Sequence, residues 1–453
     1  MSADPRTIRE LAGALRARQI SSEMVTTHCL ARIEERNPAL NAFIAVLGPE
    51  ALDAARAADR EIADGHYRGP LHGVPISLKD LIDMRGVPTT AGSRVRAGHI
   101  ASRDAAVTTR LRDAGAVIVG KTNLHEFAFG TTSEDSAFGP ARHPLDVNRS
   151  PGGSSGGSAA SVADGMAYAS IGTDTGGSIR IPAAACGLVG LKPAVDEIPL
   201  QGIVPLSPTM DHVGPLCRSV DDAAIVYDVL RGGAAEAPQQ PWTLRGARFG
   251  IPRSYFLAML DPQVAAAFDA ACARLADAGA MLEDVDIPHA ADIAAIYLHL
   301  VLSEAAAYHA KMLDSRGDDY TPNVRIRLEL GRYVLAEDYV RALRGRQLLI
   351  REVDAALRGR AALLLPALAI PAPKLGVTSV KLAGIEEPIR NAMLRLTQLF
   401  NITGHPAVAL PCGKTAVEGL PLGAQLVGAR HDTGTLLRVA AAAEPYLGPG
   451  TSR

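Results

Sequence analysis

Residues 150–186 have the sequence SPGGSSGGSAASVADGMAYASIGTDTGGSIRIPAAAC, in which two clusters of glycine and serine flank an apolar segment. The first cluster covers 152–158, and the second, at 173–178, ends in Gly176-Gly177-Ser178. Such runs are usually linkers, but a linker is not followed by an apolar helix, an apolar strand and a second cluster. Glycine lacks Cβ, so backbone N–H groups can converge on an oxyanion beside a serine nucleophile. The stretch therefore favours a catalytic site within an α/β fold.

The rest of the chain alternates short apolar runs with helical patterns. We expect strands at 74–78, 116–119, 167–171, 188–191, 248–251, 281–287, 363–365, 407–410 and 424–427, and helices at 105–114, 219–231, 263–279 and 432–445. Short buried strands that alternate with helices predict a single α/β domain with a central, mixed, twisted sheet and helices on both faces. Residues 1–65 are expected to form a helical segment packed on this domain, which covers 66–453.

Residues 232–360 are expected to be the more helical and variable part of the domain. The segment 232–245 (GGAAEAPQQPWTLR) is predicted to be a surface excursion. A long helical stretch is predicted across 290–360, and its many charges indicate a solvated helical face. This part therefore reads as a helical insertion in the α/β domain.

The charge balance and cysteine usage exclude several classes of protein. The 453 residues contain 46 Lys and Arg against 48 Asp and Glu, a formal net charge of −2, which argues against nucleic acid or a membrane as partner. The first ten residues contain no apolar segment, and no run approaches about 18 apolar residues, so we expect a cytoplasmic protein. Five widely spaced cysteines without a CxxC pair argue against disulfides and structural zinc. No metal or other cofactor is expected.

Two short motifs match known patterns by letter. Residues 115–122 (GAVIVGKT) fit the phosphate-binding pattern G-x-x-x-x-G-K-[ST], but the intervening residues are those of a buried strand, so we expect no nucleotide there. Residues 153–157 (GSSGG) fit the nucleophile elbow G-x-S-x-G, whose fold needs a downstream acid and a histidine. His212 and His405 are the candidates, but a lone histidine beside Gly and Pro is more often structural.

A lysine is the other candidate base. Residues 73–80 (GVPISLKD) place Lys79 at the end of an apolar strand. A free lysine has a pKa of about 10.4, and burial can lower this value by several units, which makes the neutral amine a usable base. Taken alone, Lys79 would be expected to pair with Asp80 or Asp83. Together with two serine loops, it is the best base available.

These three elements together closely resemble the amidase signature family of Ser-cisSer-Lys hydrolases. The central matches are 73–80 (GVPISLKD), 151–160 (PGGSSGGSAA) and 172–193 (GTDTGGSIRIPAAACGLVGLKP). Weaker matches at 120–140, 206–224, 400–413 and 419–428 extend the resemblance over nearly the whole chain. The resemblance implies the α/β fold of this family and hydrolysis of an amide.

The resemblance also implies a role for each matching residue. Ser178 matches the acylated nucleophile, Ser154 matches a bridging serine preceded by a cis peptide bond, and Lys79 matches the base that acts through Ser154. The N–H groups of Thr175, Gly176, Gly177 and Ser178 match an oxyanion hole. Asp174 and Arg180 match a supporting charge pair. The predicted substrate contacts are Phe127, Gly130, Thr131 and Ser155. Phe127, Phe129 and Tyr308 are candidates for an apolar acyl pocket or for ordinary core aromatics.

The expected function is hydrolysis of a small carboxylic amide to a carboxylate and ammonia or an amine. The main alternative is the glutamine-hydrolysing A subunit of a tRNA-dependent amidotransferase, whose AEASSNL and VKRRI stretches are not evident at 303–313 and 322–349. A stand-alone amidase is therefore favoured; a homodimer stays open, and no obligate partner protein is expected. A non-hydrolytic scaffold of the same fold is a third interpretation, against which the intact Lys79, Ser154 and Ser178 argue.

The sequence departs from the commonest family pattern at Asp135, Asp196-Glu197, Ala361 and Ala367. None of these positions belongs to the expected triad. Because of these departures, the sequence does not predict which substrate contacts or loop-anchoring contacts are made at these positions.

Overall fold

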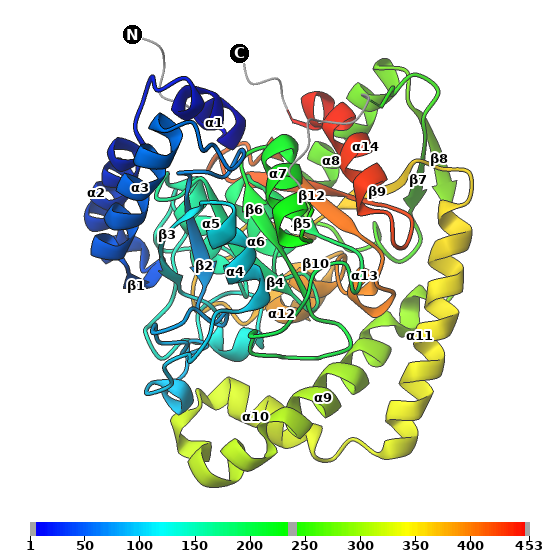
Figure 1. The fold of residues 1–453 in the computed structure, drawn as a ribbon. Helices are drawn as coiled ribbons and strands as arrows, with labels where there is room; N and C mark the ends of the chain where they lie inside the picture. The colour runs from blue at the N-terminus through cyan, green and yellow to red at the C-terminus, as the bar shows by residue number, and fades with distance from the viewer. Residues whose placement is uncertain (1–5, 234–241, 449–453) are drawn as a thin grey trace.

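The computed structural model describes residues 6–233 and 242–448. It contains one 11-stranded sheet with the strand order β1-β3-β2-β4-β6-β5-β12-β13-β9-β7-β8 (Figure 1). Strand β2 runs parallel to β3 and β4, and β7 runs parallel to β8 and β9. All other neighbours in this sheet are antiparallel. The predicted α/β domain with a mixed sheet is confirmed.

The strands of the sheet have the following bounds in chain order: β1 Phe43–Val46, β2 Pro75–Lys79, β3 Val117–Thr122, β4 Ala169–Asp174, β5 Val189–Lys192, β6 His212–Cys217, β7 Arg248–Pro252, β8 Met281–Val285, β9 Ala362–Pro366, β12 Ala407–Lys414 and β13 Pro421–Val427. A separate hairpin pairs β10 (Ser379–Leu382) with β11 (Ile385–Pro388). The nine strands expected from the sequence are all present, within a few residues at each end.

Helices cover both faces of the sheet (Figure 1). The α-helices are α1 Ile8–Arg16, α2 Ser22–Leu40, α3 Gly48–Ala63, α4 Ala106–Asp113, α5 Gly156–Ala163, α6 Arg180–Cys186, α7 Val220–Leu230, α8 Pro262–Asp277, α9 Ile293–Arg316, α10 Pro322–Gly331, α11 Ala336–Leu357, α12 Ile389–Leu394, α13 Leu399–Ile402 and α14 Thr433–Leu447. Helices α5 and α6 pack against each other and on the central strands, while α14 packs on β12, α7 and α8. The two serine-containing loops precede α5 and α6, so both helices anchor them to the sheet.

The sequence patterns did not predict β1, β6 or the β10–β11 hairpin. Strand β6 contains Gly214-Pro215, a pair whose residue types argue against a strand interior. The glycine is required because a Cβ at Gly214 would lie 2.1 Å from the Leu191 carbonyl oxygen on the neighbouring strand segment. Tertiary packing therefore overrides local preference here.

The N-terminal segment contains a strand as well as the expected helices. Strand β1 pairs antiparallel with β3 and so adds part of the N-terminal segment to the edge of the sheet. Helices α2 and α3, drawn in blue in Figure 1, pack on β3 beside this edge, while α1 contacts α7. The division of the chain at residues 65 and 66 stays a prediction.

The predicted helical stretch at 290–360 consists of three helices, α9, α10 and α11. The helical conformation is interrupted before α10. Pro322 occupies the first turn of that helix, a position that proline favours. Among the described helices, only Ala290–Asp319 is long and apolar enough by mean hydropathy to cross a membrane, and in this fold α9 packs against α10, α11 and α13. Of the predicted surface excursion at 232–245, residues 234–241 lie outside the described residues.

Candidate active site

Sheet topology brings the two serine loops and Lys79 together. Strands β2 and β4 are parallel neighbours, so their carboxyl ends meet at one edge of the sheet, where α/β proteins place functional groups. Lys79 is the last residue of β2, and the second loop leaves the end of β4. The N–H of Ser155 donates to the Ser178 carbonyl at 3.2 Å, which fixes the first loop on the second. The Gly153–Ser154 peptide bond is cis, as the family resemblance implies.

Lys79 is fully buried and bonded to both loops. Its Nζ lies 2.7 Å from Ser154 Oγ and 2.9 Å from Thr173 Oγ1. Burial lowers the pKa of Lys79 to about 7, although the charges of Asp174 and Asp211 oppose this shift. A substantial fraction of the amine is therefore neutral near pH 7 and able to accept a proton.

The loop at 175–178 contains several backbone N–H donors next to Ser178. Ser178 itself is 6% exposed. Within the described chain, the N–H groups of Gly176, Gly177 and Ser178 donate to no backbone carbonyl. Gly177 has a φ of 139°, a conformation that favours glycine. Such a run of converging donors can bind an oxygen that gains negative charge.

Residues distant in sequence hold this loop in place. The Thr397 hydroxyl donates to the Gly176 carbonyl at 2.6 Å, and the Thr175 hydroxyl donates to Asp211 Oδ1 at 2.5 Å. Burial raises the pKa of Asp211 to about 6. The Tyr297 hydroxyl packs so close to Gly176 that a Cβ there would lie 2.4 Å from it. No sequence pattern singled out Thr397, Asp211 or Tyr297, although 206–224, which contains Asp211, is among the matching stretches.

Asp174 and Arg180 form the expected charge pair, and both side chains are fully buried. The guanidinium binds the carboxylate through two contacts of 3.0 Å. Burial alone raises the pKa of Asp174, but the charge and hydrogen bonds of Arg180 more than reverse this effect and hold the pKa well below its usual range. Arg180 also donates to Asn401 and Gln425, at 2.7 Å and 3.1 Å. The pair therefore ties the loop that contains Ser178 to α13 and β13.

Replacing Arg180 with methionine is expected to lower the free energy of unfolding by about 3–5 kcal/mol, because it leaves the Asp174 charge buried without its partner. Urea unfolding followed by circular dichroism measures this loss. Arg253→Met is the matched control, since its partner Asp284 lies at the surface and both side chains are more than half exposed. The control is expected to cost no more than about 1 kcal/mol. Equal losses in the two variants would contradict a supporting role for Arg180.

The residues of the phosphate-loop and elbow motifs have structural partners. Residues Val117–Thr122 form β3, and the buried Lys121 pairs with Asp80 at 3.0 Å. Lys121 thus occupies the place that Lys79 would take if it were an ordinary ion-pair residue. His405 contacts Thr403 and Asp354, and His212 Nδ1 contacts the Met210 carbonyl, so both rings are held by other groups.

Comparison with known proteins identifies the family. Residues 24–437 match the Amidase family. The chain belongs to the amidase signature family. An amidase of Pseudomonas putida is 40% identical over 97% of this chain and 95% of that protein. The A subunit of the glutamyl-tRNA(Gln) amidotransferase of Anaeromyxobacter dehalogenans (strain 2CP-C) is 39% identical over 98% of this chain and 96% of that protein.

A solved structure supports the same assignment. The crystal structure of an amidase matches this fold with a TM-score of 0.92 and 37% sequence identity, covering 98% of this chain and 100% of the other. The protein is therefore a hydrolase that acts on amides. Among the described residues, no group of three or more His, Cys, Asp or Glu side chains is arranged to hold a metal ion.

Four residues are predicted to contact the substrate, and this role stays a prediction. The buried Phe127 ring packs on His309 and Tyr320, with centroids 4.3 Å and 5.5 Å apart. Thr131 is buried next to the first loop, since a Cβ on Gly153 would lie 2.9 Å from its carbonyl carbon. A Cβ on Gly130 would overlap the His125 ring. Ser155 is bonded to Thr173 and Ser178, so it joins the two loops.

The aromatic side chains proposed for an acyl pocket differ in exposure. Phe129 is buried beneath the Arg327 guanidinium, which lies 5.8 Å from its ring centroid. Tyr308 is partly exposed at 36% and contacts His309 edge-on. The role of both side chains in an acyl pocket stays a prediction.

The departures from the amidase pattern have structural partners. Asp135 lies 3.2 Å from His125 Nε2 and accepts from Asn323 at 3.1 Å, and the Glu197 carboxylate accepts from the Tyr227 hydroxyl at 2.8 Å. The Ala361 and Ala367 N–H groups donate to backbone carbonyls of neighbouring strands. Asp135, Glu197, Ala361 and Ala367 are therefore accommodated within the fold, while Asp196 adopts a positive φ of 66°.

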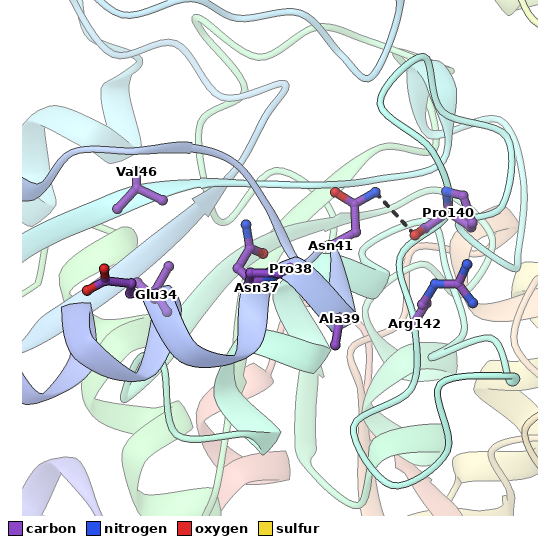
Figure 2. Close-up of a pocket in the computed structure, with 9 residues that line it drawn as sticks. Glu34, Asn37, Pro38, Ala39, Asn41, Val46, Pro140 and Arg142 are labelled. Carbon is purple, nitrogen blue, oxygen red and sulfur yellow. Dashed lines mark hydrogen bonds between the residues drawn. The ribbon is translucent and has the colours of Figure 1, made fainter.

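A surface pocket of about 520 Å³ lies beside the C-terminal end of α2 (Figure 2). At one side of it, Asn41 Nδ2 donates to the Pro140 carbonyl at 3.2 Å. Its lining residues include neither Lys79 nor any residue of the loops that contain Ser154 and Ser178. We therefore assign it no part in amide chemistry.

Proposed function

We propose that this protein is a stand-alone amidase that hydrolyses a small carboxylic amide to a carboxylate and ammonia or an amine. Ser178 is the nucleophile, Ser154 the bridging serine and Lys79 the base. The observation that carries the proposal is the 2.7 Å hydrogen bond between the buried Lys79 amine and Ser154 Oγ, on a loop bonded to the Ser178 backbone. A buried neutral amine next to a serine has the chemistry that activates a hydroxyl nucleophile.

The first half of the reaction forms an acyl-enzyme. Ser178 Oγ attacks the amide carbonyl carbon while its proton passes to Ser154 Oγ and the Ser154 proton passes to Lys79 Nζ. The oxygen of the tetrahedral intermediate accepts hydrogen bonds from the N–H groups of 175–178. As the C–N bond breaks, Ser154 gives a proton to the leaving nitrogen and regains one from Lys79. This protonation is required because an amine anion is a poor leaving group.

The second half of the reaction restores the enzyme. Water attacks the acyl carbon, and its proton passes through Ser154 to Lys79. When the tetrahedral intermediate collapses, the bond to Ser178 Oγ breaks and the proton returns to that oxygen. The product is a carboxylic acid, which ionises at neutral pH.

The A subunit of a glutamine-dependent amidotransferase is the second candidate function. The relative from Anaeromyxobacter dehalogenans favours it, and at 39% identity it is as similar to this chain as the Pseudomonas putida amidase. We favour the stand-alone amidase because the AEASSNL and VKRRI stretches of the amidotransferase are not evident at 303–313 and 322–349. A partner protein would be required for the alternative and not for the proposed function.

The deciding experiment measures ammonia release by the purified chain alone. The panel contains aliphatic, aryl and ureido amides together with glutamine. We expect turnover of at least one amide other than glutamine without any added protein. Activity on glutamine alone, or no activity until a partner is supplied, would overturn the stand-alone proposal.

A further inference from the structure

Two arginines that lack an acidic partner lie next to the candidate active site. Arg390 is on α12 and Arg327 is on α10. Within the described chain, neither guanidinium lies within 4.0 Å of a carboxylate oxygen, whereas Arg325 on α10 and Arg332 directly after it are paired with acidic side chains. A partly buried cation without a counter-ion is costly unless a ligand supplies the charge.

Arg390 lies on the face of α12 that packs on the loop at 175–178. Leu394, four residues later and on the same face of α12, packs on Gly176, since a Cβ at Gly176 would lie 3.0 Å from Leu394 Cδ2. The Tyr297 ring packs on the same glycine from α9. The Nε atom of Arg390 is buried and has no hydrogen-bond partner among the described residues. The positive charge of Arg390 also opposes the rise in the Tyr297 pKa that burial causes, so the two side chains are close.

Arg327 approaches the same place from the other side. Its Nη1 donates to the Phe129 carbonyl at 2.5 Å, immediately before Gly130 and Thr131. Burial lowers the pKa of Arg327 to about 10, and the positive charge of Arg390 adds to this shift. The two positive charges therefore act on each other, with Arg327 bonded to the Phe129 carbonyl and Arg390 on the helix that packs on Gly176 through Leu394.

The charged and polar neighbours do not balance these two cations. Asp135 is the one carboxylate whose charge acts on Arg327, and it is bonded to Asn323 and close to His125. Burial lowers the pKa of His125, which leaves that ring neutral at pH 7. One positive charge next to the substrate loops is thus left without a counter-ion. A carboxylate is the substrate group whose two oxygens match a guanidinium.

We propose that Arg390 and Arg327 bind a carboxylate on the acyl part of the substrate, so that the amide is hydrolysed as a monoamide of a dicarboxylic acid or a similar acidic amide. The inference rests on the proposed function and names its substrate class. The carboxylate would enter between α10 and α12, with the amide carbonyl directed to the loop at 175–178. Neither arginine acts on the reacting bond, so both are specificity residues.

The test compares succinamate with butyramide, which has a methyl group in place of the carboxylate. We expect the ratio of kcat/KM for succinamate to kcat/KM for butyramide to fall about 100-fold in Arg390→Met, because a buried charge-assisted pair is lost. Arg327→Met is expected to lower the ratio in the same direction, and Arg390→Lys to lower it less than Arg390→Met. The matched control is Arg395→Met, whose guanidinium stacks on Tyr255 at 3.8 Å and donates to its carbonyl, and we expect the ratio to be unchanged.

A binding measurement separates this inference from the proposed function. Succinate is expected to raise the Tm of the wild-type protein and of Arg395→Met, and not that of Arg390→Met. If no amide is hydrolysed at all, the proposed function fails, and the succinate result then decides the inference alone. A substrate ratio that Arg390→Met does not change, or a succinate shift that is absent from the wild type, would overturn the carboxylate site.

Discussion

Replacing Ser178 with alanine is expected to lower kcat for amide hydrolysis by about 10⁴-fold or more, the effect of losing the nucleophile of a covalent hydrolase. The residual rate would come from the oxyanion loop and from substrate binding, because the alanine side chain leaves Lys79, Ser154 and the backbone donors in place. Ammonia release with the best amide of the panel measures the loss. A fluorophosphonate probe followed by mass spectrometry is expected to label Ser178 in the wild-type protein and nothing in this variant.

Two serine variants make this prediction specific. Ser161→Ala removes another buried hydroxyl, one that bonds to Ser77 and to the Ser158 carbonyl on α5, and it is expected to keep most of the activity. Ser155→Ala tests the nucleophile-elbow interpretation, in which Ser155 would be labelled. Labelling of Ser155, or more than a tenth of wild-type turnover in Ser178→Ala, would contradict the assignment of Ser178.

The catalytic candidates were predictable because each lies in a short motif with strong local constraints. The glycines around Ser154 and Ser178 and the apolar strand before Lys79 are visible without any knowledge of tertiary contacts. The α/β fold was predictable for a similar reason, since most strands are continuous apolar runs of the kind that buried strands require. The proposed triad and the sheet therefore depend on patterns that extend over only a few residues.

The support of the site was not predictable in this way. Thr397, which holds the Gly176 carbonyl, lies 221 residues from it in the chain, and only the order of strands in the sheet brings them together. The ion-pair partner of Asp80 was likewise not predictable from the sequence. Successive side chains of an extended strand point to opposite faces, so Asp80 pairs with Lys121 of β3, while Lys79 turns toward Ser154. Strand β6 was missed because Gly214-Pro215 has the residue types of a turn.

Replacing Lys79 with methionine is expected to lower kcat/KM by about 10³-fold, within the range for loss of a general base. It should also change the pH profile. In the wild-type protein the neutral form of Lys79 is the active one, so kcat/KM should rise with pH through the lysine pKa of about 7 and level off above it. Rates measured between pH 5.5 and 9 should show this rise in the wild type and not in the variant. A wild-type profile that is flat over this interval would contradict Lys79 as the base.

The same substitution is expected to change stability in a pH-dependent manner. Because burial lowers the pKa of Lys79 in the folded protein to about 7, the unfolded chain binds more protons than the folded one between pH 7 and the unfolded lysine pKa of about 10.4. The stability of the wild type therefore decreases as the pH falls through this interval, and Lys79→Met removes that decrease.

The stability of the variant relative to the wild type should thus be greater at pH 7 than at pH 10, whatever the methionine costs in lost hydrogen bonds to Ser154 and Thr173. Comparing variant and wild type at each pH cancels the titration of buried groups that do not interact with Lys79. Urea unfolding at the two pH values measures the difference, and an equal effect at both would show that Lys79 keeps an ordinary pKa and is charged at neutral pH.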